Sequence, residues 1–483
     1  MAAGFMLQAP ASIAGGPVST RAEFAATLRL AGPLAAANLL QMLVWAIDVM
    51  FIARLGTIPL AAASLSFALF GTLMWALTGL TGMVSALIAA ALGRGTGVVR
   101  EVRRATRMAL WLAVLSGALL ALFMLEGEAF MLLTGQDREV AAVAGKFLAV
   151  LGWAGIPMLV CNVLRSYVSA LDRPVFATVV VALQVGIAAL ANYALVFGHF
   201  GLPALGVIGS AIASSVTAWL GVAAYVGFIA SDRRLRAYRV FGRWWSPDWG
   251  QFRRLVVLGA PVVLTIVAEG GLFNSAAFMM GLIGASELAG HTIALQLAAF
   301  AFQVPFGVAQ AATIRVGYYY GAQDVAGVSR AGWAAILVGT SFMTLTAAAM
   351  LLAPEFLVSL YIDPRDATNA ATIGFAIAFL KVAAAFQLFD GFQAVAAGSL
   401  RGLQDTRVPM WIAVLGYWIP GLGTMLWLGF WTPLAGFGIW IGLMVSLVVV
   451  AGALLTRWLL RHRLGLVPDA PGAAPQRFLP AGA

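Results

Sequence analysis

The chain has 483 residues, of which 62% are apolar and only 10% are charged, and its formal net charge is +10. A soluble domain carries about 25% charged residues, so this composition excludes an ordinary soluble protein. The single cysteine excludes an intramolecular disulfide, and the sequence has no Gly-x4-Gly-Lys-Ser/Thr phosphate loop. We therefore expect neither an enzyme nor a transporter that hydrolyses ATP on this chain.

Apolar runs of about 20 residues or more, the length that a helix needs to cross a bilayer, recur along the whole chain. The alternation that is typical of strands in an outer-membrane barrel is absent, which predicts an all-α integral membrane protein. The sequence predicts twelve transmembrane helices, at 31–53, 60–91, 106–125, 141–164, 175–197, 204–230, 255–283, 288–318, 332–360, 370–399, 408–430 and 434–460.

Arginine gathers in alternate connections between these helices. Segments such as 94–107 and 232–254 are rich in arginine, whereas the charged residues of the segment 126–139 on the opposite side are mostly acidic. This positive-inside pattern predicts a membrane protein with both termini in the cytoplasm. It accounts for the positive charge without nucleic acid as a partner. The arginines of the cytoplasmic side, including Arg165 and Arg401, are interpreted as determinants of topology.

The chain repeats itself once along its length. Pro33 and Gly93 recur as Pro261 and Gly321 at one offset (261 − 33 = 228). Each half holds six predicted helices, so both halves enter from the same face and are related by a pseudo-twofold axis along the membrane normal. The predicted order is a disordered N-terminus at 1–25, a six-helix lobe at 26–231, a cytoplasmic linker at 232–254, a second six-helix lobe at 255–463 and a disordered tail at 464–483.

Three lone carboxylates, Asp48, Glu269 and Asp390, stand inside uncharged apolar stretches. A carboxylate near the bilayer centre costs roughly 2.5–3.5 kcal/mol, so it normally faces a protein interior or a wet cavity, where it binds an ion or carries a proton. The acids do not follow the repeat, since Glu269 corresponds to Gln41. These features predict a transporter in which Glu269 and Asp390 share a cation or a proton.

With these residues in view, the chain resembles the multidrug and toxic compound extrusion family, in its bacterial NorM-type branch, over residues 24–460. The segments that carry the resemblance are Ile47-Asp48-Val49-Met50, Glu269-Gly270-Gly271-Leu272-Phe273, Ala289-Gly290-His291-Thr292, Ile314-Arg315-Val316-Gly317 and Phe386-Gln387-Leu388-Phe389-Asp390. The resemblance implies an antiporter that exports cationic, amphiphilic drugs in exchange for inward Na+ or H+, with no other cofactor.

The resemblance also implies roles for single residues. Glu269 and Asp390 match the acids of the second-lobe cation site, where Na+ is a possible ligand, and Asp48 matches an acid of the first lobe. Asn192 matches one of two asparagines of a first-lobe polar cluster, whose other position is Ala188 here. The side chains expected to line the cleft are His291, Phe273, Phe386 and Gln387, with Phe386 in a place where relatives often have tyrosine.

Three other functions stay open at this stage. A lipid or lipid-linked oligosaccharide flippase of the same superfamily needs several cations in its cleft, and the predicted helices offer chiefly Lys381. A major-facilitator transporter lacks support because its usual loop between the second and third helices is missing. An intramembrane enzyme lacks a metal cluster or a Ser–His pair. We expect the chain to be a monomer in the lipid bilayer.

Overall fold

The computed structural model describes residues 19–242 and 244–467, and all regular elements in these ranges are helices. In these ranges, the helices form twelve spans that are long and apolar enough to cross a membrane, which confirms the predicted number of transmembrane helices. The first lobe contains α1 (Thr20–Ala53), α2 (Thr57–Gly82), α3 (Val84–Arg94), α4 (Val98–Leu125), α5 (Gly127–Leu133), α6 (Arg138–Ala170), α7 (Pro174–Phe197) and α8 (Gly206–Ser231).

The second lobe follows a linker that contains the short helix α9 (Arg233–Ala237). Its eleventh transmembrane span, Arg407–Phe430, contains the π-helical turn η2, which includes Pro420. A proline cannot donate to the helical ladder, so the regular α-helical hydrogen bonding changes there while the helix continues. The elements are α10 (Trp249–Ile283), α11 (Ala285–Gly321), α12 (Val325–Leu352), α13 (Pro354–Ser359), η1 (Ala367–Asn369), α14 (Ala370–Gly402), α15 (Arg407–Gly416), η2 (Tyr417–Gly421), α16 (Leu422–Phe430) and α17 (Ala435–Leu459).

The boundaries differ from the prediction at three places. Residues 20–25 are helical rather than disordered, because Ser19 caps α1 by accepting a hydrogen bond from the backbone N–H of Ala22 at 3.3 Å. The linker ends at Asp248, which caps α10 by accepting from the N–H of Gln251 at 3.2 Å. The tail is described as far as Val467. The rest of the expected disordered ends, 1–18 and 468–483, lies outside the described residues.

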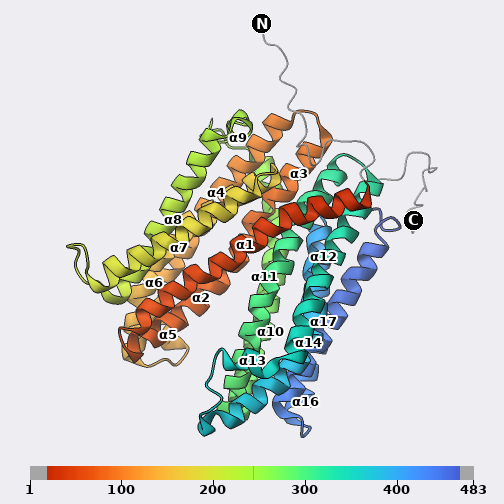
Figure 1. Cartoon of the computed structure of the whole chain (residues 1–483). Coiled ribbons are helices and arrows are strands. Elements are labelled where there is room, and N and C mark those ends of the chain that lie inside the picture. The colour runs from red at the N-terminus through yellow and green to blue at the C-terminus, as the bar shows by residue number, and fades with distance from the viewer. Residues whose placement is uncertain (1–18, 243, 468–483) are drawn as a thin grey trace, which may run out of the picture.

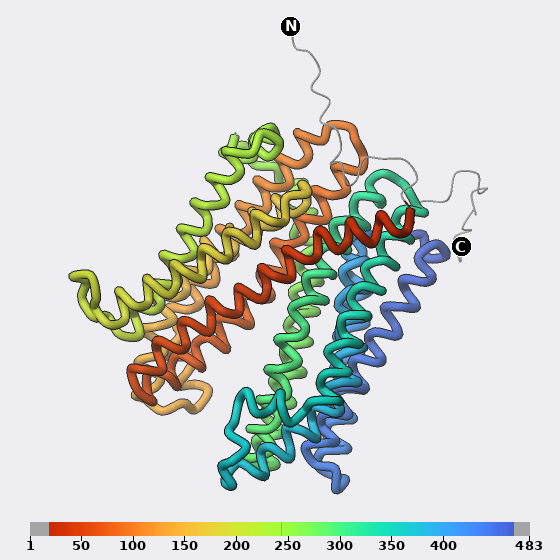
Figure 2. The backbone as a smooth tube through the Cα atoms, viewed as in Figure 1, coloured from red at the N-terminus to blue at the C-terminus, as the bar shows by residue number. Residues whose placement is uncertain are grey.

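The two lobes lie side by side and meet at one end of the molecule (Figure 1). The lobes lie together at the end where α1 begins, and they separate toward the opposite end, as the tube in Figure 2 shows. The helices that join them are α1 and α3, which pack on α11, and α2, which packs on α10. The lobes converge where α1 begins and where α4 and the linker carry their arginines.

Glycines of the internal repeat make this contact between the lobes close. A Cβ on Gly93 of α3 would overlap the carbonyl oxygen of Tyr318 on α11, and a Cβ on Gly321 of α11 would overlap that of Ala90 on α3. Gly93 and Gly321 are the pair related by the 228-residue offset, so each contact is the counterpart of the other. The packing follows the pseudo-twofold symmetry that the repeat predicts.

A buried ion pair closes the same end. Arg315 of α11 donates from Nε to Glu23 Oε1 of α1 at 2.8 Å and from Nη2 to Glu23 Oε2 at 2.6 Å. The hydroxyl of Tyr319 donates to Glu23 Oε2 at 2.8 Å. The side chains of Arg315 and Glu23 are 3% and 0% exposed. This two-point pairing ties the start of the first lobe to the second lobe.

Candidate functional site

The structure joins three helices of the first lobe around Asp48. Asp48 Oδ1 accepts a hydrogen bond from Asn192 Nδ2 of α7 at 2.7 Å, and Oδ2 accepts from the hydroxyl of Ser214 on α8 at 2.8 Å. Asn192 also donates to the carbonyl of Ala188 at 2.9 Å. Asp48 is buried, with 4% of its surface exposed, and each of its oxygens has a partner. The first-lobe carboxylate is therefore held by neutral donors.

Ser214 was absent from the sequence-based prediction. Its signal lies in α8, where Ser210, Ser214 and Thr217 recur at intervals of four and three residues and so share one helix face. Serine and threonine are common enough in membrane helices that this face alone does not point to a carboxylate on another helix. The long separation between Ser214 and Asp48 along the chain is what hid the contact.

The second lobe brings Glu269 of α10 and Asp390 of α14 close enough for their charges to interact. Glu269 also interacts electrostatically with Arg401, farther along α14, and Tyr417 of η2 interacts with both acids. Asp390 is 6% exposed, and its Oδ1 has no hydrogen-bond partner among the described residues. Glu269 is half-buried. The two acids thus lie within electrostatic range of each other, and Asp390 Oδ1 is an open acceptor, that is, one without a hydrogen-bond partner among the described residues.

The neighbouring polar side chains of this lobe also have unused hydrogen-bonding capacity. Gln387 Oε1 accepts from the Thr346 hydroxyl at 2.8 Å, while Gln387 Nε2 has no partner among the described residues. Both ring nitrogens of His291 are likewise without one, and its ring packs edge-on against Trp440 with centroids 5.5 Å apart. Phe386 packs against Trp440 and, at 6.0 Å, against Phe273.

These side chains do not line the cavity that lies between the two lobes, in contrast to the prediction for His291, Phe273, Phe386 and Gln387. His291, Phe386 and Gln387 are at most 1% exposed, because they pack in the interior of the second lobe. Phe273 is half-buried against Phe386. They lie in the interior of the second lobe and not along the space between the lobes.

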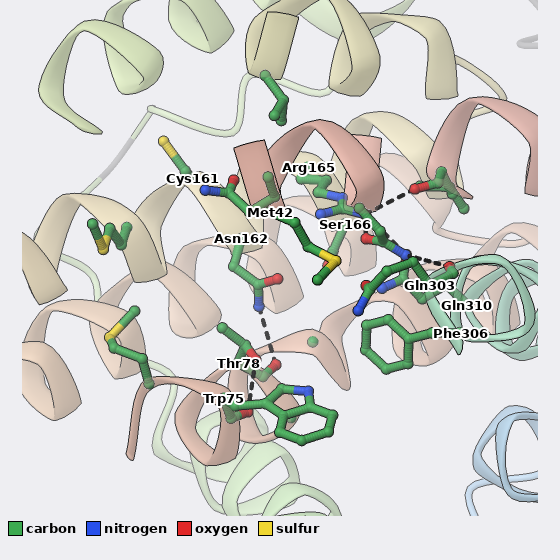
Figure 3. A pocket seen from close by; sticks show the side chains of 18 of the residues that line it. Met42, Trp75, Thr78, Cys161, Asn162, Arg165, Ser166, Gln303, Phe306 and Gln310 are labelled. Carbon is green, nitrogen blue, oxygen red and sulfur yellow. Dashed lines mark hydrogen bonds between the residues drawn. The ribbon is translucent and has the colours of Figure 1, made fainter. Parts of the chain in front are cut away.

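A cavity of about 640 Å³ lies between the lobes, mainly against α1, α2, α6 and α8 of the first lobe and α11 of the second. Figure 3 shows its polar and aromatic lining, with Asn162 donating to the Thr78 carbonyl at 3.0 Å. The aromatic side chains that line it are Trp45, Phe67, Trp75, Phe302 and Phe306. Trp75 and Phe306 face each other across the lobes, with centroids 6.4 Å apart.

Among the described residues that line this cavity, the charged side chains are Arg165 and Arg401, and none is a carboxylate. Arg165 Nη2 donates to Gln310 Oε1 of α11 at 3.2 Å and also to Asn38 Oδ1 (Figure 3). Both arginines lie within long helices and point inward, so interpreting them as topology determinants missed this role. Lys381, expected to be the chief cation of the spans, is exposed instead.

Two stretches of the chain, residues 33–194 and 261–423, match the sequence model of the MatE family. The chain belongs to the MatE family. The matches begin at Pro33 and Pro261, the residues that define the internal repeat, so the family's unit occurs once in each lobe. This result agrees with the predicted NorM-like resemblance.

Curated relatives resemble this chain over most of their own length and of its length. It is 45% identical over 445 residues to a probable multidrug resistance protein NorM of Mesorhizobium japonicum, covering 92% of this chain and 95% of that one. It is 35% identical to the multidrug resistance protein NorM of Burkholderia vietnamiensis, covering 86% and 89%.

Solved structures show the same fold. A multidrug resistance MATE family transporter of the MOP superfamily in an outward-facing conformation matches with a TM-score of 0.81 at 19% identity, covering 92% of this chain and 96% of that one. The eukaryotic MATE transporter AtDTX14 matches with a TM-score of 0.81 at 21% identity, covering 91% and 96%. The chain is therefore a multi-pass membrane protein with two six-helix lobes.

Proposed function

We propose that this chain is a multidrug antiporter that exports amphiphilic organic cations across a bacterial inner membrane in exchange for Na+ or H+. The names of its relatives support drug export as the direction of transport. The arginine-rich end, which includes the linker, is the cytoplasmic side by the positive-inside rule. With that orientation, the lobes are closed toward the cytoplasm and separate toward the outside.

The observation that carries the proposal is the pair Glu269 and Asp390, with Asp390 Oδ1 open. Two neighbouring carboxylates repel each other in a poorly solvated interior, and a bound cation or proton relieves that repulsion. An open carboxylate oxygen can take up a proton, and oxygen is the ligand that hard cations prefer. The pair therefore fits a coupling ion of either kind.

The cavity supplies the surface for the drug. A flat organic cation gains roughly 0.5–2 kcal/mol from each aromatic face that it contacts, and Trp45, Trp75 and Phe306 line the space. Asp48 lies directly behind the lining residue Ser214 and provides negative charge beside the cavity. The drug is thus held chiefly by aromatic faces and amides, with Asp48 as the nearby acid.

Arg401 links the two regions, because it lines the cavity and interacts electrostatically with Glu269. When Na+ or H+ neutralises Glu269, the positive charge of Arg401 is no longer balanced and disfavours an organic cation in the cavity. The ion and the drug then compete through charge, which is what an antiporter requires. When Na+ or H+ is bound in the second lobe, the protein favours the arrangement of the lobes that is closed to the outside.

The decisive experiment measures dye efflux from proteoliposomes under a pH gradient alone and a Na+ gradient alone. We expect one gradient to drive efflux in the wild type and Glu269→Gln to abolish that response. Glu355→Gln, an exposed acid on α13, serves as the control and keeps wild-type efflux. Full gradient-driven efflux in Glu269→Gln would refute the proposed ion site.

A lipid flippase remains the second candidate because two cations, Arg165 and Arg401, line the cavity. The multidrug names of the relatives do not favour it. Absence of efflux under either gradient, together with absence of dye binding, would shift the function toward lipid transport.

A further inference from the structure

A second cavity, of about 370 Å³, lies at the arginine-rich end between α4 and the linker. It is separate from the main cavity, and none of the residues that line it takes part in the proposed transport. Its lining consists of Arg100, Arg103, Arg104, Arg107, Ser246, Pro247, Asp248 and Trp249.

The four arginines share one face of α4. They lie at intervals of three, one and three residues, the spacing that places side chains together on a helix surface. Four like charges at this spacing repel one another unless anions lie between them. The sequence alone offers no reason for the arrangement, since charge at a membrane end needs no particular helix face.

One carboxylate of the lining opposes the four guanidinium groups. Asp248 is ion-paired with Arg104 and interacts electrostatically with Arg107, which is 5% exposed. The hydrogen bond from Arg104 holds the pKa of Asp248 below its usual value, so this carboxylate is ionised at neutral pH. Arg100 and Arg103 form no ion pair among the described residues, and the lining keeps a formal charge of +3.

Nearby tryptophans place this cavity at the membrane surface. Trp249 lines it and is 63% exposed, and Trp245 in the same part of the linker is 84% exposed. Tryptophan is enriched where lipid headgroups meet the hydrocarbon, and basic pockets between helices on the cytoplasmic side bind anionic headgroups. Arginine binds phosphate oxygens in a two-point geometry.

We propose that this cavity, defined by Arg100, Arg103, Arg104 and Arg107 together with residues 246–249, binds the phosphate of an anionic phospholipid. The bound headgroup offsets the charge of Arg100 and Arg103. It also bridges α4 of the first lobe and the linker segment that leads directly into α10 of the second lobe. An anionic lipid therefore stabilises the protein at the hinge between its halves.

The test uses the purified full chain in a neutral detergent. Phosphatidylglycerol, phosphatidylcholine and inorganic phosphate are titrated separately into the protein. Native mass spectrometry counts the bound lipid molecules, and thermal denaturation gives the unfolding temperature at each concentration. The test variant is Arg100→Gln with Arg103→Gln. The matched control is Arg233→Gln with Arg236→Gln, two exposed arginines of α9 that do not line the cavity.

We expect phosphatidylglycerol to bind and raise the unfolding temperature of the wild type and the control, and phosphatidylcholine to do neither. At roughly 1 kcal/mol for each basic residue near a lipid surface, the test variant should bind phosphatidylglycerol about 30-fold more weakly. Without lipid, the test variant should unfold at the wild-type temperature or slightly above it, because two of the four repelling charges are gone, which shows that it folds.

Two results would overturn the proposal. Equal weakening in the test and control variants would mean that lipid binds by the overall charge of this end and not in the cavity. Protection by inorganic phosphate as strong as that by phosphatidylglycerol, lost in the test variant, would mean that the cavity takes a soluble phosphate and not a lipid.

Discussion

The two lobes hold their membrane carboxylates in opposite ways. In the first lobe, Asp48 has a hydrogen bond on each oxygen, from Asn192 and Ser214. In the second lobe, Asp390 lies beside another acid, Glu269, and leaves Oδ1 open among the described residues. One repeated scaffold therefore carries one carboxylate with both oxygens hydrogen-bonded and another, that of Asp390, with an oxygen that has no partner among the described residues. A group with an open acceptor can load and release an ion, whereas a satisfied one holds its helices together.

The strongest way to break this comparison is to remove the negative charge of the carboxylate that carries the open oxygen. Asp390→Asn keeps the shape of the side chain but removes its charge, so the pair can no longer bind Na+ or exchange a proton in the same way. Coupling free energies between sites are typically 1–3 kcal/mol, so we expect gradient-driven efflux to fall by about 5- to 150-fold. Dye efflux from proteoliposomes measures the change.

Asp363→Asn is the control for this variant, because Asp363 is an exposed acid of the same lobe. The control should transport like the wild type. An Asp390→Asn protein that responds fully to the imposed gradient would show that the Asp390 carboxylate charge is not needed for coupling.

Glu23 offers a third case, a buried carboxylate with a full counter-charge. Glu23→Gln removes the carboxylate that pairs with the buried Arg315, and breaking such a pair costs about 3–5 kcal/mol. We expect a clear drop in unfolding temperature and a weaker contact between the lobes. In the exposed pair of Arg94 and Glu101, Glu101→Gln should cost at most about 1 kcal/mol. Similar losses in both variants would contradict a stabilising role for the buried pair.

Asp48 tests the satisfied side of the comparison. In Asp48→Asn the new amide can donate to the Ser214 hydroxyl, which can also accept, so both hydrogen bonds survive and the unfolding temperature should not change. Asp48→Ala leaves polar groups of Asn192 and Ser214 unpaired and should cost about 1–3 kcal/mol. Thermal unfolding compares the two variants.

Dye binding and gradient-driven efflux of the Asp48→Asn variant separate a role of Asp48 in drug binding from a role in ion coupling. Asp48→Asn should bind a cationic dye more weakly, because the negative charge beside the cavity is gone, yet keep its response to the gradient. Loss of that response with an unchanged unfolding temperature would place the coupling ion in the first lobe.

Much of this architecture could be predicted from the sequence, because its causes are local or periodic. The twelve apolar runs gave the spans, and the offset between Pro33 and Pro261 gave the two lobes. The three acids stood out because each is the only acid in its apolar run. Residues 20–25 were misjudged, since a cap formed by Ser19 extends the helix beyond its apolar part.

The cavity could not be predicted in the same way. Arg165 and Arg401 look like topology arginines in the sequence, because the positive-inside rule counts charges near helix ends and says nothing of where a side chain points. Their direction depends on the packing of α6 and α14, which is set by residues far apart in the chain. The same limit concealed Ser214, whose partner Asp48 belongs to another helix.

The smallest expected effect concerns the aromatic lining, which lies outside both acid sites. Phe306→Ala removes one aromatic face from the cavity and its edge contact with Trp75, so a flat cationic dye should bind with a loss of roughly 0.5–2 kcal/mol, or about 2- to 30-fold. Phe300→Ala is the control on the same helix, because Phe300 is 54% exposed and does not line the cavity. Fluorescence polarisation of the dye measures both. Because Phe306 touches neither acid site, its variant should keep the ion dependence of efflux, and a change in that dependence would mean that drug and ion are not held in separate regions.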